Sequence, residues 1–136
     1  MKTSIVKEIV EREIEPLKEK LGIKFWKIKV SYNLRSNSGF SADVGHCTRL
    51  VDYDQAYIQL DPSGLKNEEH VIEILLHELF HIVLSPLDIL CNSLHELFKD
   101  DEKLKGVMES IRVHSIEKAV INLERMYHNL EVKDES

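Results

Sequence analysis

The pattern of hydrophobic and polar positions predicts a helix at the N-terminus of the chain. Over residues 1–22 apolar side chains recur at roughly helical spacing among many charged ones, namely Ile5, Ile9, Val10, Leu17 and Leu21. Gly22 follows this run as a helix stop, and a break or kink is expected near Pro16. The first segment is therefore expected to be an amphipathic helix.

Three segments in the middle of the chain have the pattern of β-strands. Residues 25–32 alternate apolar and polar side chains in their second half, residues 41–51 are a weaker strand, and residues 56–60 a stronger one. Residues 34–39, rich in Asn, Ser and Gly, indicate a loop or hairpin turn. Strands followed by helices predict an α+β fold, in which a small, mainly antiparallel sheet packs on helices.

Residues 71–84, which follow the third predicted strand, would form a helix that is apolar nearly all round, and this is typical of a buried central helix. Asn67 precedes it as an N-cap and acidic residues open it, so the helix should run from about residue 68 to residue 84 and end at Ser85-Pro86. A short helix is expected around residues 95–98. A long final helix should open at Asp100 or Asp101 and continue to about Leu130.

Length, composition and charge restrict the possible classes of protein. With 136 residues, 43% of them hydrophobic and 31% charged, the chain is expected to form a single domain, residues 1–136, with a frayed polar tail at 131–136. A net charge of −6 argues against a nucleic-acid partner, which needs a basic surface. The N-terminus has no signal-peptide or membrane-spanning run. Two cysteines without a CxxC pair fit reduced thiols in the cytoplasm.

The central helix contains the pentapeptide His77-Glu78-Leu79-Phe80-His81, an HExxH motif. Two histidines four positions apart lie one turn apart on the same helix face, so both imidazoles can reach one metal ion. The intervening glutamate can then act as a general base on a metal-activated water. The motif predicts a hydrolase that binds one Zn²⁺ per chain, with Glu78 as its catalytic base. The competing interpretation is a pair of core histidines satisfied by ordinary hydrogen bonds.

A third zinc ligand has to come from another segment. The residues three and six positions after His81 are Leu84 and Leu87, which excludes a metzincin-type site. The last predicted helix offers Glu117, whose neighbours at i−4, i+3 and i+4 are all apolar, so its carboxylate should face the core and need a cation. Alternatively, Glu117 reaches solvent or pairs with a basic side chain. His114 and Glu124 are the next candidates, as ligand, orienting residue or transition-state donor.

The strand before the motif helix is the candidate for binding substrate. A strand in that place can form the edge of a cleft and bind an extended peptide by adding it to the sheet. We therefore expect the substrate to be a protein or peptide in extended form, with Tyr57, Ile58 and Gln59 at the lip of the cleft.

Three stretches of the chain carry a resemblance to a known family: AYIQLDP at 56–62, HELFHIVLSPL at 77–87 and IEKAVINLER at 116–125. They resemble small phage and prophage-encoded metallopeptidase-like proteins of the HExxH glutamate-zincin type. More distantly, the chain is similar to the ImmA/IrrE and SprT-like minimal zincin domains. The resemblance covers roughly residues 25–128.

This resemblance implies zinc ligands at His77, His81 and Glu117, with Glu78 as the general base. One departure is that ImmA-like domains usually have a glycine just before the second histidine, where this chain has Phe80. A shared substrate is therefore not implied. Two functions stay open: a zinc-dependent peptidase, and a non-catalytic adaptor or regulatory protein that keeps a structural zinc. The retention of Glu78 favours the first, because a structural site needs no general base. The oligomeric state does not follow from the sequence.

Overall fold

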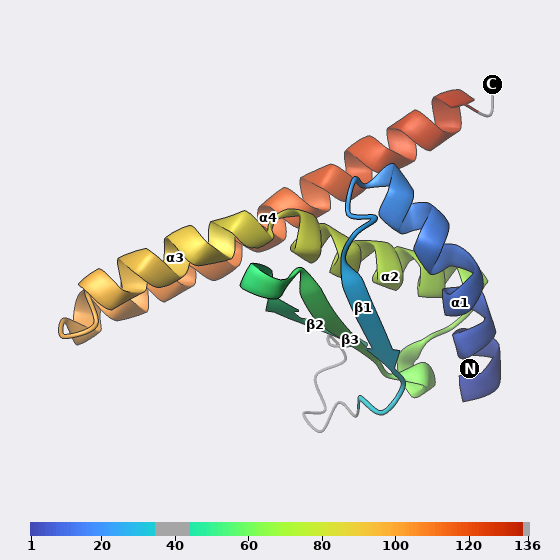
Figure 1. The fold of residues 1–136 in the computed structure, drawn as a ribbon, viewed down its shortest axis with the longest axis horizontal. Helices are drawn as coiled ribbons and strands as arrows, with labels where there is room; N and C mark the ends of the chain where they lie inside the picture. Colours follow the sequence, from blue (N-terminus) through green and yellow to red (C-terminus); the bar gives the residue numbers. More distant parts are fainter. Residues whose placement is uncertain (35–43, 135–136) are drawn as a thin grey trace. The chain divides into compact units, whose positions relative to one another are not determined.

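The computed structural model describes residues 1–34 and 44–134, and these form an α+β fold (Figure 1). The predicted fold class is thus confirmed. The elements are α1 (Thr3–Lys20), β1 (Lys27–Ser31), β2 (Gly45–Leu50), η1 (Val51–Tyr53), β3 (Gln55–Leu60), η2 (Pro62–Gly64), α2 (Glu68–Val83), α3 (Ser85–Leu97) and α4 (Glu102–Asp134). The chain separates into two compact units, residues 1–83 and 84–136, which we describe in turn.

Helix α1 ends where the sequence predicts. Gly22 adopts a left-handed conformation with φ +73°, which glycine takes without a steric penalty. Its N–H donates to the carbonyl of Glu19 (3.2 Å), and the Ile23 N–H donates to the carbonyl of Lys18 (3.0 Å), as in a Schellman motif. Pro16 lies inside the helix, which continues past it, so the expected break does not occur.

The three strands form a mixed sheet in the order β1-β3-β2. Strand β1 runs parallel to β3, from Lys27 opposite Gln55 to Ser31 opposite Gln59. Strand β2 runs antiparallel to β3 and is joined to it through η1. The hairpin partner β2 pairs with one side of β3 in the antiparallel direction, and β1 pairs with the other side in the parallel direction. The sheet is therefore mixed rather than mainly antiparallel.

The expectation that residues 56–60 form the edge of a cleft is wrong, because β3 is the central strand. Both of its sides are already paired, so Tyr57, Ile58 and Gln59 cannot accept an added peptide strand without losing β1 or β2. The burial of β3 agrees with its central position in the sheet, since the side chains of Ala56, Ile58 and Leu60 are at most 1% exposed. The edge strand beside α2 is β2.

The core of the first unit lies between the sheet and helices α1 and α2. Its fully buried side chains come from α1, β3 and α2 and include Val6, Val10, Ile58, Leu60, Val71, Leu75 and Leu79. Burial of α2 agrees with its nearly uniform apolar sequence. Asn67 caps this helix, since its Oδ1 accepts a hydrogen bond from the N–H of His70 (2.8 Å), as predicted.

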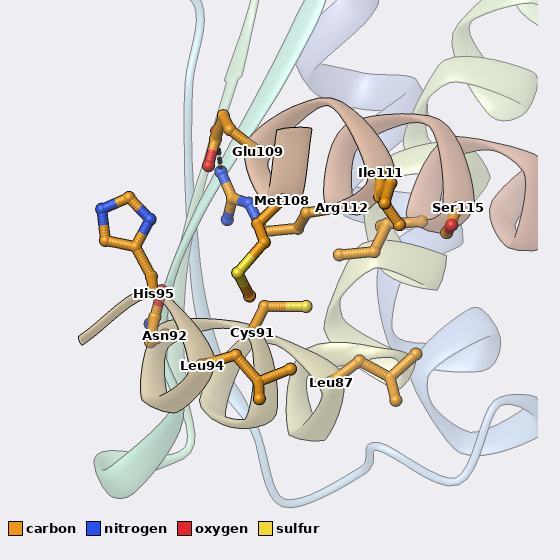
Figure 2. A pocket seen from close by; sticks show the side chains of 11 residues that line it. Leu87, Cys91, Asn92, Leu94, His95, Met108, Glu109, Ile111, Arg112 and Ser115 are labelled. Carbon is orange, nitrogen blue, oxygen red and sulfur yellow. Dashed lines mark hydrogen bonds and ion pairs between the residues drawn. The ribbon is translucent and has the colours of Figure 1, made fainter. Parts of the chain in front are cut away.

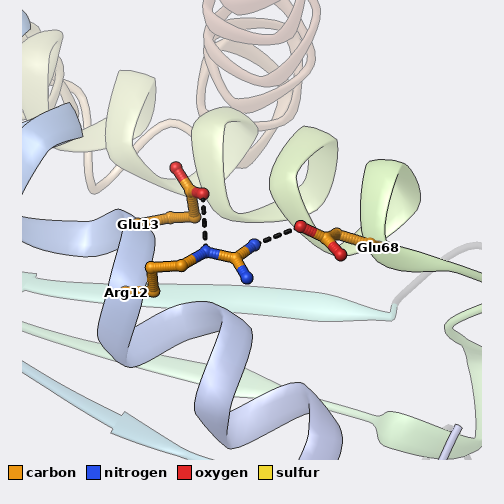
Figure 3. Close-up of polar contacts among 3 residues, drawn as sticks. All are labelled: Arg12, Glu13 and Glu68. Atoms are coloured by element: carbon orange, nitrogen blue, oxygen red, sulfur yellow. Dashed lines mark hydrogen bonds and ion pairs between the residues drawn. The ribbon is translucent and has the colours of Figure 1, made fainter.

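An ion pair joins α1 to the first turn of α2 (Figure 3). Arg12 donates through Nη2 to Glu68 and through Nε to Glu13 Oε1, the second at 3.0 Å. Hydrogen bonds to these two carboxylates raise the pKa of the Arg12 guanidinium. Both side chains of the pair are exposed to solvent, so the pair adds little to stability.

The second unit contains α3 and α4, which contact one another. Pro86 occupies the first turn of α3, where its missing N–H leaves no bond unmade, so Ser85-Pro86 both ends α2 and begins α3. Asp101 caps the start of α4, since its Oδ1 accepts a hydrogen bond from the N–H of Leu104 (3.1 Å).

Two predictions concern segments at the limits of the described chain. Helix α4 continues to Asp134, so residues 131–134 of the expected frayed tail are helical. No glycine or proline interrupts that stretch, and the helix has no local reason to stop earlier. Of the predicted loop at 34–39 only Leu34 is described, and its N–H donates to the carbonyl of Leu60 (3.2 Å). The rest of that loop, residues 41–43 and residues 135–136 lie outside the described residues.

Candidate metal centre

Helix α2 places the two histidines of the HExxH motif side by side. His77 and His81 are one turn apart, their ring centroids are separated by 5.1 Å, and the rings are inclined at 66°. Both histidine side chains are half-buried, and the residues just before and after this segment of the helix, Leu76 and Ile82, are buried. The four-residue spacing thus produces the paired imidazoles that the motif predicts.

Glu117 of α4 completes a group of three potential ligands. One ligand atom from each of His77, His81 and Glu117 lies within 4.8 Å of the others, so this cluster could hold a metal ion. The two other candidates on α4 do not belong to the group: His114 is exposed, and Glu124 is half-buried. Among the candidate third ligands in the described chain, only Glu117 belongs to this group.

The donor set fits zinc. Two imidazole nitrogens and one carboxylate oxygen are the protein ligands of many catalytic zinc sites, which keep a fourth position for water or substrate. Ligand atoms on a tetrahedral zinc lie about 3.3 Å apart, given metal–ligand distances of about 2.0–2.1 Å. The three donor atoms lie within 4.8 Å of one another, a grouping compact enough for one ion.

Glu78 is held in a tight space next to the first histidine. It is 5% exposed, and the bare backbone of Gly45 in β2 lies against it. A Cβ built on Gly45 would lie 2.8 Å from Glu78 Oε1 and 2.8 Å from Ile74 Cγ2, closer than real Cβ contacts. Gly45 is a residue that the sequence analysis did not single out. A glycine within a predicted strand often marks such a close approach, and that signal could have found it.

The residues expected to bind substrate separate into two groups. Ile58 is fully buried and points into the core, whereas Tyr57 and Gln59 lie on the opposite face of the sheet. None of the three belongs to the metal-binding group. The backbone next to Glu78 comes from Gly45 instead.

A separate pocket of about 510 Å³ lies between α3 and α4 (Figure 2). Apolar side chains such as Leu87, Leu94 and Ile111 line it, together with the ion pair between Arg112 and Glu109. It contains none of the three potential metal ligands. The candidate metal centre is therefore identified by its two imidazoles and one carboxylate, and not by this pocket.

Comparisons with known proteins give no further guidance, since no protein-family model, no curated protein and no solved structure matches this chain. Within the described ranges no single helix is long and apolar enough to cross a membrane, and only α2 and α3 taken together reach that length and composition.

Proposed function

We propose that this chain is a zinc-dependent peptidase, with zinc held by His77, His81 and Glu117. The observation that carries the proposal is the grouping of one ligand atom from each of these residues within 4.8 Å. Two histidines of an HExxH motif and a carboxylate distant in sequence are the donor set of a zinc site with two histidines and one glutamate, which supports the proposal. The motifs that resemble small zincin-type proteins of phages and prophages support the same assignment.

Glu78 is the proposed general base. A bound zinc would polarise the substrate carbonyl and lower the pKa of a water molecule in its open position. Glu78 follows His77 directly in α2 and is nearly buried, so its carboxylate is kept from bulk solvent. Its role is to accept the proton of the attacking water and to pass it to the leaving amine. A metal site with a purely structural role would have no use for this residue.

The proposed substrate is a protein or peptide bound in extended form. Because β3 is central, the strand that adjoins Glu78 is β2, and a substrate aligned with the sheet would meet Glu78 there. The proposed setting is the cytoplasm, where thiols stay reduced, because the two cysteines of the sequence form neither a CxxC pair nor a disulfide framework.

Replacement of Glu78 by glutamine separates a peptidase from an adaptor with structural zinc. Glu78→Gln keeps the shape of the side chain and removes the proton acceptor, so zinc content and folding should be retained. Hydrolysis of an unfolded protein in the presence of zinc should fall about 10²–10⁴-fold. Glu73→Gln is the matched control, because Glu73 is an exposed glutamate in the same helix. Cleavage products are measured by gel electrophoresis and mass spectrometry.

Two outcomes would contradict the peptidase. Cleavage by Glu78→Gln at the wild-type rate would assign the activity to another base or to a contaminating protease. Stoichiometric zinc without cleavage of unfolded substrates by the wild type would favour the adaptor.

A further inference from the structure

The sheet of the first unit has a second face, formed by alternate residues of its three strands. In the register of the sheet, Tyr57 of β3 lies opposite Lys29 of β1 and Thr48 of β2. Side chains alternate between the two faces of a sheet, so the residues two positions before and after these three lie on the same face as them. We call these nine residues the outer sheet face: Lys27, Lys29, Ser31, His46, Thr48, Leu50, Gln55, Tyr57 and Gln59. Six of them are exposed and three are half-buried, whereas Ala56, Ile58 and Leu60 point into the core.

The outer sheet face is hollowed around its central tyrosine. A shallow pocket of about 460 Å³ is lined by residues of all three strands, Lys29, Val30, Ser31, Thr48, Tyr57 and Gln59. The ammonium group of Lys29 lies 6.0 Å from the centre of the Tyr57 ring. This spacing is at the outer limit of a cation–π contact, so the lysine stays available to a partner.

The charge of the outer sheet face is opposite to that of the whole chain. The chain has 24 acidic and 18 basic residues, but the nine residues of this face include two lysines and a histidine and no acidic residue. The nearest acidic side chains in sequence are Asp52 and Asp54, in the turn between β2 and β3, and Asp61, which follows β3. Asp61 is buried, and its Oδ1 accepts hydrogen bonds from Ser63. A partner with carboxylates would meet an attractive surface here and a repulsive one over much of the rest of the molecule.

Exposed apolar side chains gather at the same place. In the described part of residues 1–83 there are five exposed large hydrophobic residues: Ile5, Phe25, Leu50, Tyr53 and Tyr57. Tyr57 and Leu50 belong to the outer sheet face, while Phe25 (88% exposed) and Tyr53 (73% exposed) lie at the end of the sheet where β1 begins and β2 ends. Single exposed apolar residues need no explanation, but four around one face are typical of an interaction surface rich in aromatic side chains.

We propose that the outer sheet face binds an acidic polypeptide segment that also carries apolar side chains. The carboxylates of the segment pair with Lys27 and Lys29, and its apolar side chains pack on Tyr57 and the adjoining aromatic residues. A nucleic acid is the less favoured partner, because two lysines neutralise only two phosphates of a polyanion that the acidic chain otherwise repels. This binding site goes beyond the proposed peptidase and needs no metal.

Fluorescence anisotropy on the full chain tests this site with three labelled probes of equal length. The first is a synthetic peptide of glutamate, phenylalanine and glycine, the second replaces each glutamate by lysine, and the third is an oligothymidylate. The acidic peptide should bind saturably and more weakly at high salt, and the two other probes should bind at least about tenfold more weakly. Chelation of zinc should leave its affinity unchanged, which separates this site from the proposed metal centre.

Charge reversal locates the site on the sheet. The double variant Lys27→Glu/Lys29→Glu should weaken binding of the acidic peptide by about tenfold or more. The control Lys103→Glu/Lys105→Glu makes the same change in net charge at two exposed positions of α4 and should change affinity by less than about twofold. Tyr57→Ala should weaken binding without changing its salt dependence. The proposal is overturned if the acidic peptide does not bind, if the oligothymidylate binds as tightly, or if the two double variants are equally impaired.

Discussion

Gly45 and Glu78 lie so close that no side chain fits between them. A Cβ on Gly45 would be 2.8 Å from Glu78 Oε1, and the same atom would be 2.8 Å from Ile74 Cγ2. The edge strand β2 therefore limits where the Glu78 carboxylate can lie, in addition to the helix that carries it. In the proposed peptidase, the proton acceptor is positioned by a residue with no side chain of its own.

Gly45→Ala should consequently impair the base and spare the metal ligands. The new methyl group has to displace the Glu78 carboxylate and the Ile74 side chain, and such overpacking costs about 1–3 kcal/mol of stability. We expect hydrolysis to fall by about tenfold or more, since a misplaced base loses much of its contribution. Zinc stoichiometry should remain that of the wild type. Enzyme kinetics, metal analysis and thermal unfolding measure the three effects.

The control for this substitution is Gly106→Ala in α4, where the added Cβ would meet no atom within 4 Å beyond its chain neighbours and the nearby backbone of its own helix. Alanine is favoured over glycine inside a helix by about 0.5–1 kcal/mol, so this variant should be as active as the wild type and slightly more stable. Full activity of Gly45→Ala would show that contact with β2 does not position Glu78.

The choice of third ligand can be tested by comparing two glutamates of one helix. Glu117→Ala should weaken zinc binding by about 10–100-fold or more, because Glu117 is the carboxylate grouped with the histidines. Glu124→Ala, seven positions further along α4, should have a much smaller effect. Competition with a chromophoric zinc chelator measures both affinities. A greater loss from Glu124→Ala or His114→Ala would keep the helix as the source of the ligand and transfer the role to that residue.

A pH-dependent contribution to stability is expected from Glu109 in α4. Arg112 Nη2 donates to Glu109 Oε1 at 2.7 Å, and this hydrogen bond lowers the pKa of the carboxyl group. A pKa that is lower in the folded state means that the pair stabilises the fold above the unfolded pKa of about 4.3. The contribution is lost as the pH falls through the lower, folded pKa.

The effect of Glu109→Gln should be small, because both side chains of the pair are about a third exposed or more. We expect a loss of at most about 0.5 kcal/mol at pH 7, and no difference from the wild type at a pH well below the folded pKa. Urea unfolding at the two pH values gives the comparison. A difference that persists in acid would have to arise from packing rather than from charge.

Local features of the sequence were sufficient for much of the fold. Gly22 and Asn67 act within one helical turn, and the histidine pair depends only on the period of α2. The extent of α3 was harder to predict, because Pro86 ends one helix and is also acceptable in the first turn of the next.

The order of the strands could not be predicted in the same way. The alternation of apolar and polar residues in β3 shows which of its side chains are buried. The central position of β3 depends on pairing with β1, more than twenty residues earlier in the chain. The contact between Gly45 and Glu78 likewise depends on how β2 packs against α2. The sequence pointed to Glu117 through its apolar neighbours, and Glu117 belongs to the group that could hold a metal ion, although its neighbour Val113 is exposed. Its role as a zinc ligand stays a prediction.

The metal content of the protein tests the account most directly. Native mass spectrometry of protein prepared with zinc available should give about one zinc per chain. The double variant His77→Ala/His81→Ala should hold none, while His70→Ala, which replaces a half-buried histidine of the same helix outside the metal-binding group, should hold as much as the wild type. A wild-type chain without metal, or a double variant that retains its zinc, would contradict the proposed centre and the peptidase that depends on it.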